Sequence, residues 1–307
     1  MPHELSIAGL RLLLAALCRA QPALPGRAGA AVARAARLRL SPAEADAEAG
    51  IDALRRRLAA SAERVRVQDF GAGTRDGVLA AEARPAERAV AEIYGRAASG
   101  PAWGRFLFGL ARGLRPARVL ELGTNLGVSA AHLAAALRLN DAASSPDEGP
   151  GPDAGAGPSR LVTLEGDPGL AVRAREALQR LGHGPDRAEV VTGRFDDTLA
   201  AACDAAGPFG LVFVDGHHEE AAARRYAAAI RPHLAAGALV VLDDVEPGRP
   251  VRRAWAALRP EADAALYLGK LGLLYYAGPP RGPEAPCAYG PETAAGSHRA
   301  APASQAP

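Results

Sequence analysis

Residues 118–134 read "RVLELGTNLGVSAAHLA", and this stretch decides the fold. The apolar run at 119–122 is typical of a strand that is buried on both faces. Gly123 and Gly127 bracket a turn, and the Ala- and Leu-rich stretch 128–139 predicts a helix. A strand, a glycine-rich turn and a helix in this order place backbone N–H groups beside a nucleotide-sized ligand.

The residue at the end of this strand indicates the kind of ligand. The spacing is Glu-x-Gly-x-x-x-Gly, which differs from the Gly-x-Gly-x-x-Gly pattern of a pyrophosphate binder. A carboxylate at Glu121 would repel a diphosphate but would attract a ligand that carries a positive charge. The sequence therefore predicts a cofactor with a cationic group.

The composition narrows the protein class. A chain of 307 residues with 49% hydrophobic and 5% aromatic residues can build one large α/β core from Leu, Val and Ala. The net charge of +2 and the arginines interspersed with acids give no reason to expect a nucleic-acid partner. The three cysteines, Cys18, Cys203 and Cys287, are scattered, which fits a reducing cytoplasm.

The N-terminal apolar stretch at 5–18 is interrupted by Arg11 and is shorter than the roughly 20 residues of a membrane span. Glu4 stands where a signal peptide would carry positive charge. We therefore expect an amphipathic helix that packs on the body of the protein and no membrane span. A helix lying on a membrane surface is the alternative.

The chain divides into two regions and a tail. Residues 1–115 are expected to form a helical cap, with a strand and a glycine-rich loop within 64–77, "RVRVQDFGAGTRDG". The part "DFGAGTR" (69–75) is the candidate cover of the cofactor, and an ordinary surface turn is the alternative. The helices of the cap are expected near 4–18, 43–60, 86–99 and 103–113. The tail 278–307 is rich in Pro, Gly and Ala and is expected to be disordered, as is the insertion 141–159, which has almost nothing to bury.

From residue 116 to 277, apolar strands alternate with Ala-rich helices. The strands are expected near 118–122, 161–165, 187–192, 210–214 and 238–242. This alternation predicts a parallel sheet with helices on both faces. Only two residues separate the last runs, 264–268 and 271–276, so these form an antiparallel hairpin. The expected fold class is α/β, a Rossmann-like, doubly wound, mostly parallel seven-stranded sheet with an antiparallel C-terminal hairpin, plus N-terminal helices.

The second strand, in "LVTLEGDP" (161–168), ends at Glu165, and ligands bind at the carboxyl edge of such sheets. When the insertion is discounted, the spacing from the glycine-rich loop approaches the roughly 20 residues that precede a ribose-binding acid. We predict that Glu165 holds a ribose. The alternative is that it begins the next helix, although Asp167 and Pro168 already supply that signal.

Three further carboxylates end the later strands, namely Asp215, Asp243 and Asp244. Carboxylates that converge are costly unless a cation or hydrogen-bond donors compensate them. Oxygen-rich clusters suit Mg²⁺ or another divalent cation, so the three residues are a candidate metal site. The alternative is that Asp243 or Asp244 only binds loop backbone.

Two adjacent histidines follow Asp215. Their side chains point in different directions, and no third ligand lies at zinc spacing. His217 is explained as part of a polar helix N-terminus. His218 is the candidate general base, and Asp215 is the second candidate catalytic residue.

Five segments in order resemble the class I S-adenosylmethionine-dependent methyltransferases, namely "VLELGTNLGVSA", "LVTLEGDP", "VVTGRFDDTL", "LVFVDGHH" and "GALVVLDDV". The likeness is to the small-molecule O-methyltransferase branch, which includes the catechol and caffeoyl-CoA types, and is greatest to bacterial members of unassigned substrate. With "DFGAGTR" and "WGRFLFGL" it spans about residues 50–277. It implies O-methylation of a small molecule, and nitrogen and sulfur acceptors are the alternatives. A homodimer is possible in this family.

The resemblance also implies roles for single residues. It places Glu121, Gly123, Gly127 and Ser129 around the methionine part of the cofactor, and Glu165 at the ribose. It places Arg194, Phe195 and Asp196 around the adenine, and Asp215 beneath the sulfonium. The catechol type binds its metal through Asp, Asp and Asn, where this chain has Asp215, Asp243 and Asp244. The position of the catalytic Lys of that type is taken here by His218.

Two other classes share parts of this pattern. A non-catalytic S-adenosylmethionine-binding protein would bind the cofactor without turnover. A nicotinamide-dependent oxidoreductase would share the alternation, but it would need a third glycine and would have no use for Glu121.

Overall fold

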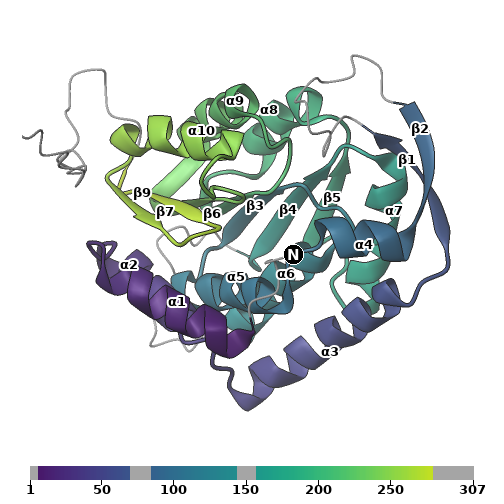
Figure 1. Ribbon diagram of the computed structural model, residues 1–307, viewed down its shortest axis with the longest axis horizontal. Helices are drawn as coiled ribbons and strands as arrows, with labels where there is room; N and C mark the ends of the chain where they lie inside the picture. Colours follow the sequence, from purple (N-terminus) through teal and green to yellow (C-terminus); the bar gives the residue numbers. More distant parts are fainter. Residues whose placement is uncertain (1–5, 70–83, 144–156, 279–307) are drawn as a thin grey trace, which may run out of the picture.

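The computed structural model describes residues 6–69, 84–143 and 157–278, and its centre is one seven-stranded sheet between two layers of helices (Figure 1). The strand order is β5-β4-β3-β6-β7-β9-β8. The strands are β3 (Arg118–Leu122), β4 (Arg160–Glu165), β5 (Ala188–Thr192), β6 (Phe209–Val214), β7 (Leu234–Leu242), β8 (Ala264–Tyr267) and β9 (Gly272–Tyr276). The first five are parallel, and β9 pairs antiparallel with both β7 and β8. The predicted fold class is confirmed.

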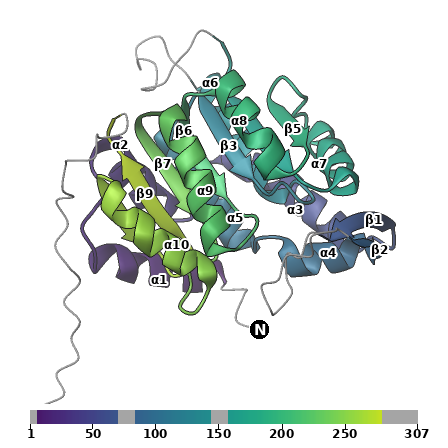
Figure 2. The ribbon, with the colours of Figure 1, turned by 90° about the horizontal axis from the view of Figure 1, so that it is seen from above.

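Helices cover both faces of the sheet, as Figure 2 shows from above. On one face lie α5 (Pro101–Leu114), α6 (Val128–Ala142) and α7 (Pro168–Arg180); on the other lie α8 (Phe195–Ala206), α9 (Glu220–Ile230) and α10 (Pro250–Leu258). Short 3₁₀ turns, Arg231–His233 and Arg259–Glu261, follow α9 and α10. Successive side chains of a strand point to opposite faces of the sheet. Val119 therefore packs on the face covered by α5, α6 and α7, and Leu120 on the face covered by α8, α9 and α10. Glu121 therefore lies on the face of α6.

The order of the strands positions the site. From the central β3 the chain first builds outward through β4 to β5, and then returns to add β6 and β7 on the other side. The edge between β3 and β6 is thus the topological switch point, where α/β sheets bind their ligands. The expected site residues lie at the carboxyl ends of these strands.

The N-terminal region contains the helices α1 (Ile7–Arg19), α2 (Gly26–Ala35), α3 (Pro42–Ala59) and α4 (Val90–Ala97) and the antiparallel strands β1 (Arg64–Asp69) and β2 (Arg84–Ala89). The prediction of a helix over 86–99 was wrong for its first residues, because 84–89 pairs with β1. This ribbon packs on α7. Tertiary pairing overrides the helix propensity of Ala and Glu here, and Pro85 is tolerated because β2 is an edge strand.

The helix α2 was not predicted, because Pro25 and the glycines around it are local breakers. It is stabilised by close packing on α5. A Cβ at Gly109 would lie 3.0 Å from the Cα of Ala35, and one at Gly113 would lie 2.7 Å from the Cα of Ala31. Small residues on both helices thus allow the two backbones to approach, and this tertiary contact is invisible to a local pattern.

The first helix packs on the body of the protein, as expected. Leu10 and Leu14 of α1 are fully buried. The Gln21 side chain then binds β8, accepting from Tyr267 N at 2.9 Å and donating to its carbonyl oxygen at 2.7 Å. Within the described part of the chain, no helix has the length and apolarity to cross a membrane.

The expected insertion begins later than residue 141, because α6 continues to Ala142. Residues 144–156 and 279–307 lie outside the described residues, as does the loop "DFGAGTR" beyond Asp69. The two flanks of 144–156 are joined by hydrogen bonds: Ser159 N and Oγ donate to Asp141 at 3.1 and 2.6 Å. Arg187 also donates to Asp141.

Replacement of residues 144–156 by a short Gly-Ser link should leave the melting temperature nearly unchanged. The flanks already lie together, and the entropy of loop closure changes slowly with loop length. Asp141→Ala in the intact chain should instead lower the Tm by roughly 3–12 °C, since a hydrogen bond to a charged group contributes about 1.5–3 kcal/mol. Differential scanning calorimetry of the two variants checks both results. A large fall in Tm for the shortened chain would show that this segment stabilises the fold.

Candidate cofactor and acceptor site

The loop after β3 lies across the ends of two neighbouring strands. Gly123 N donates to the carbonyl oxygen of Leu164 at 3.0 Å. The φ of Gly123 is +101°, and a Cβ at this position would lie 2.1 Å from the carbonyl oxygen of Asp215. Only glycine can occupy it. Gly127 ends the loop with a φ of +79° as the N-cap of α6, so the helix N-terminus faces the switch point.

Glu121 is fully buried at the end of β3, with one carboxylate oxygen satisfied and one left open. Thr163, its neighbour on β4, donates to Oε2 at 2.6 Å. Among the described residues, Oε1 has no hydrogen-bond partner. Burial raises the pKa of Glu121 to about 7, although the hydroxyls of Ser129 and Thr163 oppose the rise. An open carboxylate oxygen in this place fits a cationic ligand group.

Glu165 is buried at the end of β4 and holds two backbone N–H groups. It accepts from Asn125 N at 2.7 Å and from Asp167 N at 2.9 Å. Burial raises its pKa, and these two N–H groups oppose the rise. Asp167, and not Glu165, caps α7 by accepting from Leu170 N at 2.7 Å. The helix-start explanation of Glu165 is therefore wrong, and its place at the strand end suits ribose hydroxyls.

The residues expected around the adenine begin α8. Phe195 meets the ring of Tyr226 edge-on, with 5.7 Å between centroids. A Cβ at Gly216 would lie 2.7 Å from the Phe195 ring, so glycine is needed for this approach. Arg194 is the N-cap of α8, and Asp196 binds Arg225 at 3.2 Å. The aromatic side chain is thus held beside the loop that follows β6.

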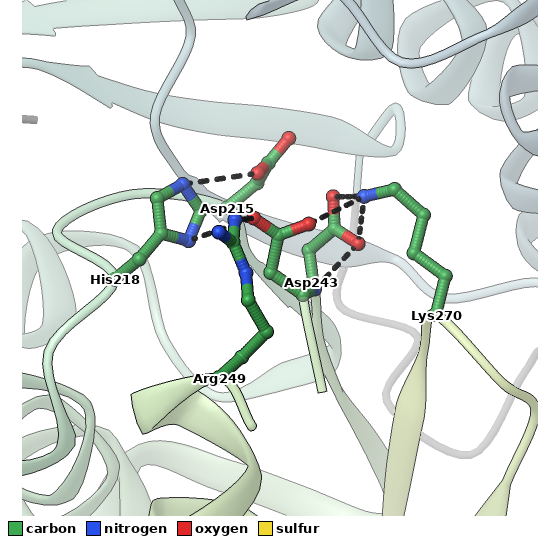
Figure 3. Close-up of polar contacts among 6 residues, drawn as sticks. Asp215, His218, Asp243, Arg249 and Lys270 are labelled. Carbon is green, nitrogen blue, oxygen red and sulfur yellow. Dashed lines mark hydrogen bonds and ion pairs between the residues drawn. The ribbon is translucent and has the colours of Figure 1, made fainter. Parts of the chain in front are cut away.

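The three expected aspartates do come together, and Figure 3 shows the groups around them. Burial and the neighbouring Asp243 raise the pKa of Asp215 well above its usual range. Asp243 accepts a hydrogen bond from Asp244 N at 2.8 Å, so it does bind loop backbone. Arg249 pairs with Asp244. Burial alone would raise the pKa of Asp244, but the neighbouring Lys270, His218 and Arg249 lower it to about 2.

The cation among these carboxylates is Lys270. Its Nζ contacts both oxygens of Asp243 and lies 3.1 Å from Oδ1 of Asp244 (Figure 3). Burial alone would lower its pKa, but Asp243, Asp215 and Asp244 raise it. Within residues 6–69, 84–143 and 157–278, no three His, Cys, Asp or Glu side chains form a group that could hold a metal ion. The residues present therefore do not fit the expected divalent cation.

His218 lies between two of the aspartates (Figure 3). Its Nε2 is 3.9 Å from Oδ1 of Asp215, and its Nδ1 is 3.7 Å from Oδ2 of Asp244. A third of the side chain is exposed, at 33%. His217 points elsewhere, with Nδ1 2.6 Å from the Tyr226 hydroxyl. Of the two histidines, His218 can exchange a proton with a molecule at the strand ends.

Motif reasoning missed Lys270, because it lies in the turn of the C-terminal hairpin and outside every motif. The pairing of β9 with β7 brings this turn to the carboxyl end of β7. The sequence did carry a signal. Lys270 is the only lysine of the chain, whose 36 basic residues are otherwise all arginines.

The comparisons with known proteins agree with this geometry. Residues 120–245 match the model of a family described as a methyltransferase domain. Catechol O-methyltransferase from Mycobacterium tuberculosis is 39% identical over 146 residues, which cover 47% of this chain and 56% of that protein. Catechol O-methyltransferase from Niastella koreensis is 32% identical over 141 residues, or 46% of this chain and 53% of that protein. The chain thus spans about half the length of the curated relatives it matches.

Solved structures include the O-methyltransferase TomG from Streptomyces achromogenes in complex with SAM, which has a TM-score of 0.46 and 27% identity over 59% of this chain and 82% of that one. The cofactor-bound Rv0187 from MTB has a TM-score of 0.45 and 26% identity over 83% of this chain and 99% of that one. The family match agrees with the expected class, because residues 120–245 match a methyltransferase domain and both curated relatives are O-methyltransferases.

Proposed function

We propose that the protein transfers the methyl group of S-adenosylmethionine to a hydroxyl of a small molecule. The observation that supports this most directly is the pair of buried carboxylates, Glu121 and Glu165, at neighbouring strand ends of the switch point. The open Oε1 of Glu121 suits the amino group of the cofactor, and Glu165 suits its ribose. Both lie beside the loop that Gly123 and Gly127 shape.

The acceptor would bind beside the sulfonium, near Asp215 and His218. In the reaction the acceptor oxygen attacks the methyl carbon, the bond from that carbon to sulfur breaks, and S-adenosylhomocysteine leaves with the electron pair on sulfur. The hydroxyl proton goes to the His218 imidazole, and the carboxylate of Asp244, 3.7 Å from Nδ1, stabilises the imidazolium. Alignment of the in-line displacement supplies most of the rate.

Catechols are the first acceptors to test, because both curated relatives carry that name. The protein with methyl-labelled S-adenosylmethionine is to be given catechols, single hydroxyls, thiols and amines, with products read by mass spectrometry. Transfer to hydroxyls supports the proposal. Transfer to thiols or amines alone contradicts the acceptor class. Cofactor binding without turnover indicates a non-catalytic binding protein, and absence of binding contradicts the proposal altogether.

Cofactor affinity should depend on pH near neutrality through Glu121. Its pKa in the free protein is about 7, and a bound amino cation favours the ionised carboxylate. Below pH 7 binding must therefore expel a proton, and the Kd of S-adenosylmethionine should rise by up to about tenfold per pH unit. Calorimetry in buffers of different ionisation enthalpy measures both the Kd and the proton release. Glu121→Gln should flatten the profile, and an unchanged slope in that variant would assign the proton to another group.

A further inference from the structure

We propose that the ammonium of Lys270 is the resident cation of the Asp215, Asp243 and Asp244 cluster, and that the protein works without a divalent metal there. The catalytic part of this inference rests on the proposed function. The metal-binding part rests only on the contacts of Lys270. Lys270 is a positioning residue in this account, because it acts through the carboxylates that it holds.

Lys270 contacts both carboxylate oxygens of Asp243, so its ammonium takes the place that a metal would need. The side chain of Asp243 is buried to 2% exposure, and the same Nζ also binds Asp244. Asp243 additionally accepts from the N–H of Asp244. Mg²⁺ requires nearly octahedral oxygen ligands at short distance, so a metal could bind here only after the ammonium had left.

The backbone holds Lys270 in this position. Val245 N, two residues after Asp243, donates to the carbonyl oxygen of Lys270 at 2.9 Å. Lys270 N donates to the carbonyl oxygen of Leu268 at 3.1 Å, which closes the hairpin turn. The side chain is largely covered, at 19% exposure. The ammonium is therefore built into the site by the pairing of the hairpin with β7.

Two of the three carboxylates in the cluster are each paired with a cationic side chain without a metal. Lys270 compensates Asp243, and Arg249 pairs with Asp244. Asp215 remains as the carboxylate that faces His218. A divalent ion among these groups would lie against a fixed ammonium, and such like-charge contacts are costly in a partly desolvated site.

The choice of residue supports the same role. Arginine is used at all 35 other basic positions of the chain, and lysine stands only here. An ammonium is a compact charge with three donors, whereas a guanidinium is a planar fork. The three donors can reach the two oxygens of Asp243 and one oxygen of Asp244 at once. The compact ammonium therefore fits this cluster better than a planar guanidinium.

The experiment compares Mn²⁺ binding by the full-length protein and by Lys270→Met, measured by electron paramagnetic resonance. The wild type should bind no Mn²⁺ stoichiometrically, whereas Lys270→Met should gain at least roughly tenfold in affinity as the repulsion is removed. Arg253→Met is the matched control, since it removes one positive charge from an exposed pair with Glu220. It should gain nothing. Stoichiometric Mn²⁺ binding by the wild type, or no gain in Lys270→Met, would overturn the inference.

A second measurement uses the wild type alone and does not depend on the folding of a variant. Lysine labelled with ¹³C at Cε gives one lysine signal, because the chain has a single lysine. Mn²⁺ in the cluster would broaden that signal, so an unchanged signal is expected. Turnover should also survive chelation, and loss of turnover that Mg²⁺ restores would overturn the metal-free reaction. If no acceptor is methylated, the proposed function fails, while Mn²⁺ binding and the lysine signal still decide the role of Lys270.

Discussion

The His218→Ala protein should bind S-adenosylmethionine as tightly as the wild type but transfer the methyl group about 10²–10⁴-fold more slowly. The imidazole lies 3.9 Å from Asp215 and 3.7 Å from the ionised Asp244, and Asp244 can stabilise the imidazolium that forms when the ring takes a proton. No described contact of His218 involves the expected cofactor residues Glu121 or Glu165. The effect should therefore fall on kcat and not on the Kd of the cofactor.

His233→Ala is the control for this variant, because His233 lies outside the site and forms an ion pair with the exposed Asp204 at 3.6 Å. Its kcat should equal that of the wild type. A fully active His218→Ala protein would exclude His218 as the base, and Asp215 would then be the candidate.

Glu165→Ala should weaken the binding of S-adenosylhomocysteine by roughly 10²–10⁴-fold, since two hydrogen bonds to a charged group contribute about 1.5–3 kcal/mol each. The expected loss has two sources. The ribose hydroxyls lose their acceptor, and the N–H groups of Asn125 and Asp167 lose theirs, which loosens the loop beside the cofactor. Isothermal titration calorimetry measures the Kd.

Two matched variants separate these effects. Glu165→Gln keeps one carbonyl acceptor and should lose less affinity than Glu165→Ala. Glu189→Ala removes a carboxylate from the neighbouring strand that pairs with Arg160 at 2.8 Å, and it should leave the Kd unchanged. Equal cofactor binding by Glu165→Ala and the wild type would refute the ribose assignment.

The sheet could be predicted from the sequence because each strand is a short apolar run between turn signals. The gap of two residues, Gly269 and Lys270, correctly required an antiparallel hairpin. The ribbon of β1 and β2 could not be predicted in full, since 84–89 has no local strand signal and is extended only through its pairing with β1. The close packing of α2 on α5 likewise depends on residues far apart in the chain.

The acidic residues of the site could be predicted from the sequence, but Lys270, the cation that pairs with them, could not. Glu121, Glu165, Asp215 and Asp243 each end a strand, and parallel strands end at one edge, so their proximity follows from the order of the elements. Lys270 reaches the same edge from a hairpin turn that runs against the parallel strands. Its position depends on which strand pairs with β7, and residue spacing alone does not contain that information.

The single lysine also makes the C-terminal hairpin a reporter of its own opening. A protease that cuts only after lysine has one target in the whole chain, the bond that follows Lys270. In the folded protein this bond lies in a turn closed by backbone hydrogen bonds, with the side chain held by two aspartates. Cleavage must wait until the hairpin separates from β7. The cutting rate, measured under native conditions, therefore gives the free energy of local opening of the C-terminal hairpin.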